Sequence, residues 1–372
     1  MNGPVLDPGF ATDSSVRLLS PAARVAAMCR FEAALVRASA VAGVVPDDAA
    51  AAIAAACERG VADPDAVLAE GWEAGTPVIP LLDRLRADLH GPAAEWLHHG
   101  ATTQDVVDTA QLLLARDVIG TVRQDLVSIA ATLREIAVAH RGTATTAWTL
   151  LQPAVPTTIG RRTVSWLDPM VNHLRALREL PSTFPVQLGG PTGTLAEFGD
   201  TATAVVADVA DELDLTVPRL PWHTDRSPVR QLTTVVADVA ATCSKVGTDL
   251  ALLSHQGRVR MRAGRSSSMA AKRNPIDAVR AIAAADACAA TACLVLRSRP
   301  QELERGIGGW HTEWFGLPLV LHTCAAAVEG LRQAVTSLEF VEDTESVEGG
   351  PTFATDTAVS RVLTACDREL LL

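Results

Sequence analysis

Aromatic residues are scarce in this 372-residue sequence, which has no tyrosine and only 4% aromatic residues in total. β-Sheets are usually rich in aromatic and β-branched residues, whereas alanine, abundant in this chain, favours close-packed helices. The sequence also lacks uninterrupted apolar runs of about 18 residues, so we predict no membrane-spanning helix. Its N-terminus lacks a basic stretch followed by an apolar core, and nothing therefore indicates secretion.

The cysteines lack the spacing of a disulfide or metal framework. There are seven, an odd number, and no two stand in a Cys-x-x-Cys arrangement. Several fall on apolar helical faces. We therefore interpret them as buried free thiols of a reducing compartment, neither disulfides nor zinc ligands, and expect a cytoplasmic protein.

Acidic residues are missing from one segment of an otherwise acidic chain. The net charge is −11, yet residues 256–276 contain no Asp or Glu. Their Gly/Ser core offers backbone N–H groups and hydroxyls among converging cations, which suits a polyanionic small molecule; a solvated linker between helices would have a similar composition. The acidic chain and the lack of interleaved aromatics argue against nucleic acid. The basic residues of the segment are Arg258, Arg260, Arg262, Arg265, Lys272 and Arg273.

Long heptad patterns are the main feature that is present. Apolar residues keep strict 3–4 spacing from Leu112 to Ile136 and from Trp314 to Leu338. A helix from Asp105 to His140 would be about 50 Å long. Helices of this length bury their seams against one another, which predicts an all-α, elongated bundle. Looser versions of the pattern occur at 164–177, 195–213 and 232–253.

The chain divides into three parts by composition. Residues 1–100, punctuated by proline and glycine, are expected to form a small, mostly helical N-terminal domain that is irregular and comparatively poor in helix. Residues 101–341 hold the long-helix bundle. Residues 342–372 begin with an acidic Gly-Pro linker and hold one predicted helix, Thr355–Leu370, which we interpret as the remnant of a truncated C-terminal domain.

The basic segment carries a family resemblance. The fumarase/aspartase superfamily has a signature loop, usually Gly-Ser-Ser-x-Met-Pro-x-Lys-x-Asn-Pro, and residues 266–275, Ser-Ser-Ser-Met-Ala-Ala-Lys-Arg-Asn-Pro, resemble it. Two departures are Arg265, where glycine is usual, and Ala270, where proline is usual. The resemblance implies that a serine six residues before the lysine acts as base, and that the lysine and asparagine hold the carboxylate whose charge grows. The implied site residues are catalytic Ser266, Lys272 and Asn274, and substrate-binding Ser267 and Met269.

A second stretch precedes the long helix. Residues 98–105, His-His-Gly-Ala-Thr-Thr-Gln-Asp, are similar to the His-x-Gly-Ala-Thr-Ser-Gln-Asp of 3-carboxy-cis,cis-muconate cycloisomerases. Helix capping by Thr102 or Thr103 would explain the hydroxyls, but not the paired histidines and the glutamine. The resemblance implies that Thr102, Thr103 and Gln104 bind a substrate carboxylate and that His98 lies near it.

Three further stretches match the same family. On their own, residues 148–158 would be an irregular loop before a helix that Thr157 or Thr158 caps. The resemblance places Leu150 where fumarases carry a histidine, and it places Gln152 in the substrate site. We therefore expect Leu150 to wall the pocket, because leucine cannot transfer a proton. Residues 187–195, Gln-Leu-Gly-Gly-Pro-Thr-Gly-Thr-Leu, would let backbone approach a ligand or a neighbouring subunit. Residues 304–314 contain Arg305, which the resemblance makes a carboxylate clamp.

The resemblance implies an intramolecular addition or elimination next to a carboxylate, as in carboxymuconate cycloisomerases. It implies a small polycarboxylate substrate, no metal or organic cofactor, and a homotetramer whose sites are shared between subunits. The tetramer also agrees with the heptad seams, one of which a monomer would leave exposed. Two alternatives stay open. One is a β-elimination lyase acting on a succinate-type compound such as nitrosuccinate and releasing fumarate, and the other is a non-catalytic helical scaffold.

Overall fold

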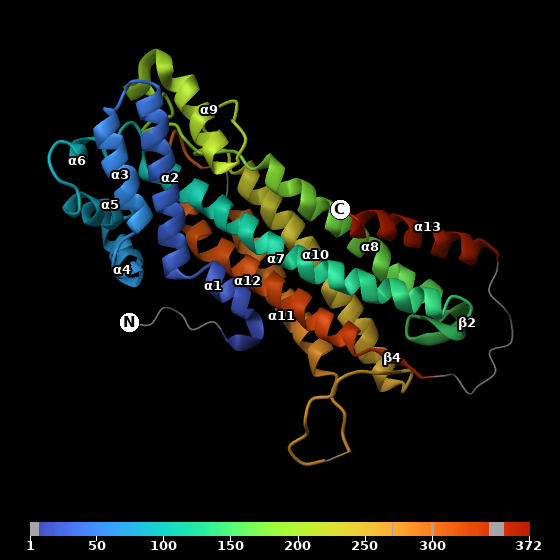
Figure 1. Cartoon of the computed structure of the whole chain (residues 1–372). Coiled ribbons are helices and arrows are strands. Elements are labelled where there is room, and N and C mark those ends of the chain that lie inside the picture. Colours follow the sequence, from blue (N-terminus) through green and yellow to red (C-terminus); the bar gives the residue numbers. More distant parts are fainter. Residues whose placement is uncertain (1–6, 270, 299–300, 342–352) are drawn as a thin grey trace.

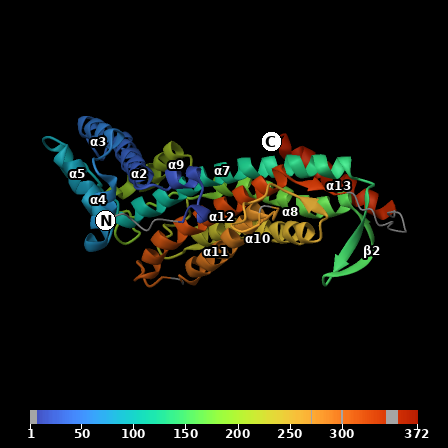
Figure 2. The ribbon, with the colours of Figure 1, turned by 90° about the horizontal axis from the view of Figure 1, so that it is seen from below.

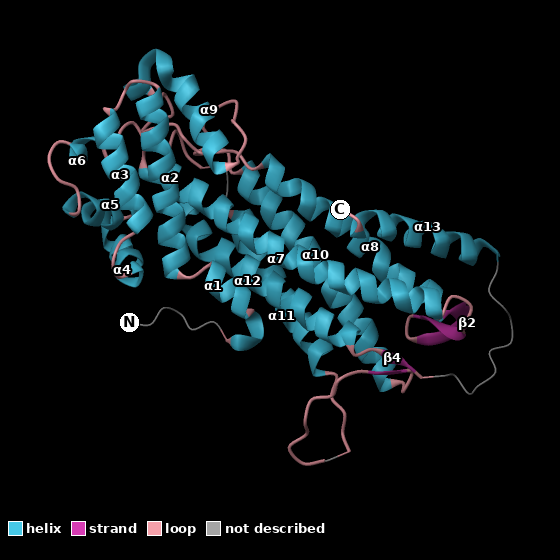
Figure 3. Ribbon diagram, viewed as in Figure 1, coloured by secondary structure: helices cyan, strands magenta, loops and turns pink. Residues whose placement is uncertain are grey.

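The computed structural model describes residues 7–269, 271–298, 301–341 and 353–372, with the backbone alone for 353–355. Nearly all of its regular structure is helical (Figure 3), which confirms the predicted all-α class. Two short antiparallel pairs join β1 Ala144–Thr149 to β2 Gln152–Thr158, and β3 Val259–Arg260 to β4 Glu339–Phe340. The α-helices are α1 Asp13–Leu18, α2 Pro21–Val41, α3 Asp47–Arg59, α4 Pro64–Ala74, α5 Val78–Ala87, α6 Ala93–Trp96, α7 Thr103–Ala139, α8 Ile159–Glu179, α9 Ala202–Leu213, α10 Ser227–His255, α11 Ile276–Arg297, α12 Gly309–Thr336 and α13 Phe353–Leu370.

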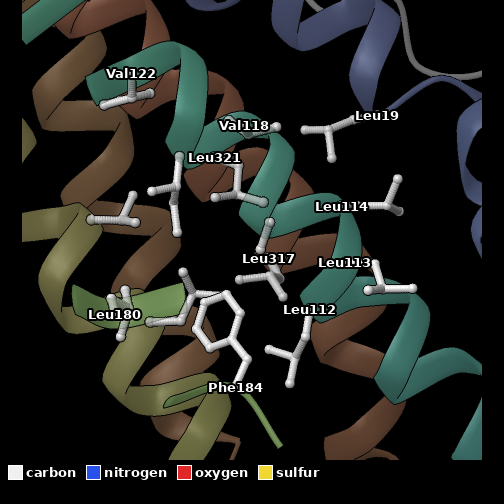
Figure 4. Packing of buried hydrophobic residues seen from close by; sticks show 14 of the residues in the cluster. Leu19, Leu112, Leu113, Leu114, Val118, Val122, Leu180, Phe184, Leu317 and Leu321 are labelled. Atoms are coloured by element: carbon white, nitrogen blue, oxygen red, sulfur yellow. The ribbon is translucent and has the colours of Figure 1, made fainter. Parts of the chain in front are cut away.

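Five long helices, α7, α8, α10, α11 and α12, form the predicted elongated bundle (Figure 1). The 37 residues of α7 span about 55 Å. α12 packs on α7, α10 and α11, which makes it the central helix. Figure 4 shows part of this core, where Leu112 and Val118 of α7 lie among Leu317 and Leu321 of α12 and Phe184.

Both heptad seams are buried within a single chain. From Leu112 to Leu133 on α7 and from Leu317 to Val335 on α12, the seam residues are at most 5% exposed. Our expectation that a monomer would leave one seam exposed was wrong, because α7 and α12 pack on each other and on α8, α10 and α11. The apolar face that stays uncovered belongs to α11 instead. Its residues Ile276, Val279 and Leu294 are between 38% and 49% exposed.

The first hundred residues are mostly helical, as predicted, whereas the expectation that they would be irregular and comparatively poor in helix was wrong. Prolines begin several of these helices. Pro21 and Pro64 stand in the first turns of α2 and α4, where a missing N–H is harmless, and the N-cap side chains of Ser20 and Asp63 accept hydrogen bonds there. The helices α2–α6 gather at one end of the bundle (Figure 1).

The predicted C-terminal helix is present as α13. It lies along α8 and α7, with Val359 and Cys366 buried and a 2.7 Å ion pair between Arg178 and Glu369. The acidic linker before it falls in 342–352, outside the described residues, as does Ala270 of the signature loop. The domain boundaries near residues 100 and 341 stay predictions.

The stretch that we interpreted as an irregular loop is a β-hairpin. Thr149 pairs with Gln152, so Leu150 and Leu151 form a two-residue turn, with φ of +50° and +61°. Turns with two positive φ angles normally use Asn and Gly, and leucine is strained there. Leu150 is 98% exposed, and the hairpin stands away from the bundle (Figure 2). The helix that follows, α8, is capped by Thr158, as predicted.

Two helices are long and apolar enough to cross a membrane when judged by length and composition, although no uninterrupted apolar run exists. In α12, 72% of the apolar stretch is buried, as in the core helix of a folded bundle. In α11 the share is 33%, because one face of this helix is uncovered in the single chain. Length and apolar composition alone do not distinguish a membrane-spanning helix from a buried core helix.

Candidate functional site

The predicted site residues lie in three separate places on the single chain (Figure 1). One is the start of α7 together with Arg305, the second is the loop between β3 and α11, and the third is the hairpin with Gln152. The 22 residues of α11, about 33 Å, separate the loop from Arg305. The hairpin follows the far end of α7, which is longer still. One small substrate therefore cannot contact all three places within one chain.

Arg305 and Thr102 meet at the start of α7, although they are 203 residues apart in sequence. Arg305 Nη1 donates to Thr102 Oγ1 over 2.6 Å, and the guanidinium lies 5.9 Å from the Trp310 ring centroid. Burial lowers the pKa of Arg305, although Asp105 and Asp108 oppose this shift. Arg305 forms no ion pair with any described residue. A half-buried cation beside a helix N-terminus, without a neutralising carboxylate, favours an anionic ligand.

His98 is held four residues before Thr102. Its Nδ1 lies 2.6 Å from Oε1 of the fully buried Glu32 on α2. Burial acts to lower the pKa of His98, but the charge and hydrogen bond of Glu32 outweigh burial and raise it above its ordinary value. The φ of His98 is +66°, a strained conformation for a residue with a Cβ. The imidazole is thus fixed in orientation and biased towards its charged form.

Asp105 ties the glycine-rich segment 187–195 to the start of α7. Its Oδ2 accepts from the Thr102 and Gly190 amides, both at 2.9 Å, and its Oδ1 accepts from the Gly189 amide at 3.1 Å. His223 Nε2 lies 2.7 Å from the same Oδ1. The glycines, which we expected to approach a ligand or another subunit, approach this carboxylate of their own chain. Gly190 also needs its positive φ of 70° for the turn.

A buried ion-pair network joins Arg226 to Asp108 on α7 and Glu313 on α12. Arg226 donates to Asp108 at 2.7 and 2.9 Å and to Glu313 at 2.6 and 3.1 Å, and all three side chains are 0% exposed. Trp310 Nε1 donates to Asp108 over 2.8 Å. Burial by itself would lower the pKa of Arg226, but the two carboxylates raise it well above its usual range. Arg226 has no signal in the sequence that would mark it as a site residue, since its partners are 118 and 87 residues away.

Gln104 and Thr103 occupy different environments. Gln104 is 1% exposed, and its Nε2 donates to Asp108 over 3.1 Å and to the His223 carbonyl over 2.8 Å. Both hydrogen bonds of the Gln104 side-chain amide are therefore made within the protein. Thr103 is the first residue of α7 and is partly exposed. A substrate contact of either residue stays a prediction.

The signature loop is anchored at its base. The Gly264 amide donates to the Asn274 carbonyl over 2.8 Å, which closes the loop. Arg262 donates to Asp277 at 2.6 and 2.9 Å, and Asp277 is 5% exposed. The hydrogen-bonded carboxylate of Asp277 raises the pKa of Arg262. These contacts fix both ends of the nine residues between Gly264 and Asn274.

Ser266 lies within this loop, and its hydrogen bonds within the described part of the chain are to backbone amides. Its Oγ accepts from the Met269 amide at 3.1 Å and from the Ser268 amide at 3.4 Å. Amides aimed at this oxygen favour its negatively charged form. Ser267, Met269 and Lys272 are exposed, and Asn274 is partly buried.

Gln152 is exposed at the start of β2, beside the strained turn. A cavity of about 160 Å³ under this turn is lined by Trp148, Leu151, Arg162 and Asp249 together with residues of the α10 end. Leu150 does not line it and points into solvent, so the expected apolar pocket wall is not formed within one chain. In the described part of the chain, no group of three His, Cys, Asp or Glu side chains could hold a metal ion.

The chain is similar to several known proteins. A family model described as lyase matches residues 15–285. The 3-carboxy-cis,cis-muconate cycloisomerase of Pseudomonas aeruginosa is 38% identical over 87% of this chain and 72% of its own length. The nitrosuccinate lyase of Streptomyces davaonensis is 36% identical over 86% of this chain and 71% of its own length.

The fold comparison leads to the same family. The crystal structure of the 3-carboxy-cis,cis-muconate lactonizing enzyme from Pseudomonas putida superposes with a TM-score of 0.85 at 34% identity. The superposed region covers 91% of this chain and 78% of the Pseudomonas putida chain. The range of the family model, residues 15–285, includes the start of α7 and the signature loop. The chain therefore belongs to the fumarase/aspartase superfamily of lyases, on the branch of the 3-carboxy-cis,cis-muconate cycloisomerases.

Proposed function

We propose that this protein is a cycloisomerase that converts 3-carboxy-cis,cis-muconate to a carboxymuconolactone. The observation that carries the proposal is the contact between Arg305 and Thr102, which leaves a half-buried guanidinium, without an ion pair to any described residue, beside a helix N-terminus. Such a position suits a carboxylate of the substrate. Relatives named as cycloisomerases carry the proposal from a carboxylate site to this reaction.

The reaction adds one substrate carboxylate oxygen across a carbon–carbon double bond. A carbon–oxygen bond forms, the double bond breaks, and its electron pair moves to the carbon beside a second carboxylate. Lys272 and Asn274 stabilise the charge that grows on that carboxylate. Ser266 then gives its hydroxyl proton to the carbanion and regains one from solvent, so the product is an isomer of the substrate. In the reverse direction the Ser266 alkoxide removes the same proton, helped by the amides that already point at its Oγ.

We further propose a cytoplasmic homotetramer in which each site combines parts of three subunits. Support comes from the start of α7, which a single chain keeps apart from the hairpin by the length of α7 and from the signature loop by the length of α11. The uncovered apolar face of α11 supplies a surface for assembly. In this arrangement Ser266 comes from one subunit, Arg305 with Thr102 from a second, and Gln152 from a third.

A second candidate is a lyase that eliminates nitrite from nitrosuccinate and releases fumarate. It is favoured by the match to the nitrosuccinate lyase, which covers nearly as much of the chain. Ser266 would remove the proton beside the carboxylate, and the electron pair would form the new double bond as nitrite leaves. No lactone could form from this substrate.

The direct test is turnover by the purified protein. Carboxymuconate should lose its conjugated-diene absorbance while a lactone appears by NMR, and nitrosuccinate should give no fumarate. Fumarate and nitrite production without lactone formation would replace the first candidate by the second. No turnover of either compound, in a folded tetramer, would leave the scaffold alternative.

Subunit sharing has its own test in complementation. Ser266→Ala and Arg305→Ala should each be inactive alone. When the two are unfolded together and refolded as mixed tetramers, about one site in four should combine an intact Ser266 with an intact Arg305 from different subunits. Recovery of about a quarter of wild-type activity is therefore expected. A mixture as inactive as its parents would contradict the shared site.

A further inference from the structure

A cavity of about 570 Å³ lies under the signature loop. It is bounded by the end of α10, by β3 and by both sides of the loop base. None of its lining residues is acidic, and two are arginines, Arg260 and Arg273, next to the predicted catalytic Asn274. The remaining lining residues are Ser254, Gly257, Val259, Met261, Ala263 and Pro275.

The two arginines are not used by the fold. By contrast, Arg262, two residues after Arg260, has a structural role, because it forms an ion pair with the buried Asp277. Arg260 and Arg273 are exposed and form no ion pair with any described residue. Arg260 stands opposite Glu339 in the β3–β4 register, yet these two side chains form no ion pair either. Two cations in one cavity without a carboxylate are mutually repulsive, and an anion relieves this repulsion.

We infer that this cavity binds the third carboxylate of the substrate through Arg260 and Arg273. This carboxylate neither forms the new carbon–oxygen bond nor carries the charge that grows beside Lys272 and Asn274. The inference rests on the proposed function and deepens it. Asn274 lines the same cavity, so a substrate held there keeps a second carboxylate within reach of the reacting residues. The two arginines thus select tricarboxylates over dicarboxylates, because a dicarboxylate leaves the cavity without its anion.

The test compares two ligands that differ by one carboxylate. Propane-1,2,3-tricarboxylate and glutarate are titrated into the wild-type protein, Arg260→Gln and Arg273→Gln by isothermal calorimetry. Each variant should weaken tricarboxylate binding by about ten- to a hundredfold, the value of one charged hydrogen bond. Glutarate binding should change by less than about threefold. Arg219→Gln, which changes an exposed arginine outside the cavity, is the matched control.

The turnover experiment separates the inference from the proposed function. With carboxymuconate, Arg260→Gln should raise KM and leave kcat nearly unchanged, because the arginine binds ground state and transition state alike. Arg260→Lys, which keeps the charge, should recover part of the lost affinity. Unchanged tricarboxylate binding in both glutamine variants, or equal weakening of both ligands, overturns the inference while wild-type turnover stands. Absence of wild-type turnover overturns the proposed function instead, and the ratio of the two affinities still tests the cavity.

Discussion

Replacing Arg226 by methionine tests the network that supports the site. The substitution keeps most of the apolar stem and removes the guanidinium that Asp108 and Glu313 share. Breaking a buried ion pair by removing one partner costs about 3–5 kcal/mol. Asp108 keeps its hydrogen bonds from Trp310 and Gln104, whereas Glu313 keeps, among the described residues, a 3.3 Å contact from Ser298, so most of the cost falls on Glu313. We therefore expect the free energy of unfolding to fall by about 5 kcal/mol.

Urea unfolding followed by circular dichroism at fixed protein concentration measures this loss. Arg219→Met is the matched control, because an exposed arginine should change the free energy of unfolding by less than about 0.5 kcal/mol. A triple variant, Arg226→Met with Asp108→Asn and Glu313→Gln, should recover most of the stability, since no buried charge is then left unpaired. A loss below about 1 kcal/mol in the single variant, or a triple variant no more stable than it, would refute the reasoning.

The same variant has a pH signature. Burial already raises the pKa of Glu313, while Arg226 opposes that shift. Without Arg226 the folded-state pKa of Glu313 rises further above its unfolded value. Such a group stabilises the folded state below the unfolded pKa, and that contribution is lost as pH rises through the folded pKa. The stability deficit of Arg226→Met should therefore shrink on acidification and be largest at neutral pH.

Three other outcomes are expected. Ser266→Ala should lower kcat by about 10² to 10⁴ and leave the melting temperature unchanged; stopped-flow assays and calorimetry measure both, and turnover within threefold of wild type would assign the base elsewhere. Leu150→Asn with Leu151→Gly should stabilise the chain by about 1 kcal/mol by relieving the positive-φ strain; if activity is unchanged as well, the leucines serve no purpose in the site. Glu32→Gln should lower the pKa of His98 in an NMR titration, and because Glu32 raises that pKa, the stability from the pair is present at acidic pH and is lost as pH rises through the pKa of folded His98.

The long helices could be predicted from the sequence because their signal is local and repeated. The predicted helix from Asp105 to His140 is observed as Thr103–Ala139, and the seam ending at Leu338 is observed as α12 ending at Thr336. The first hundred residues were harder, because a proline can follow the end of one helix or stand in the first turn of the next, as Pro64 does in α4. The hairpin was missed for the opposite reason, since a Leu-Leu turn carries none of the usual turn residues.

The site shows a similar division. Motif resemblance pointed to Thr102 and Arg305, and the structure brings these two together. It could not point to Arg226, which belongs to no local pattern and acquires its role only when α7 and α12 dock around it. It also could not reveal that the expected wall residue Leu150 stands in solvent in the single chain. Long-range packing decides both facts, and neither local propensity nor spacing encodes it.

The cysteines, all seven within the described residues, give the chain a built-in chemical reporter. Burial raises the pKa of Cys29 to about 12 and those of Cys288 and Cys366 to about 11, so these thiols stay protonated and unreactive at neutral pH. Cys293 alone is exposed, contrary to the expectation that the cysteines are buried, and it lies on α11, the helix with the uncovered apolar face. A thiol reagent should therefore label the native single chain at one position. The rate of that labelling distinguishes an α11 open to solvent from one covered by another subunit, without any engineered residue.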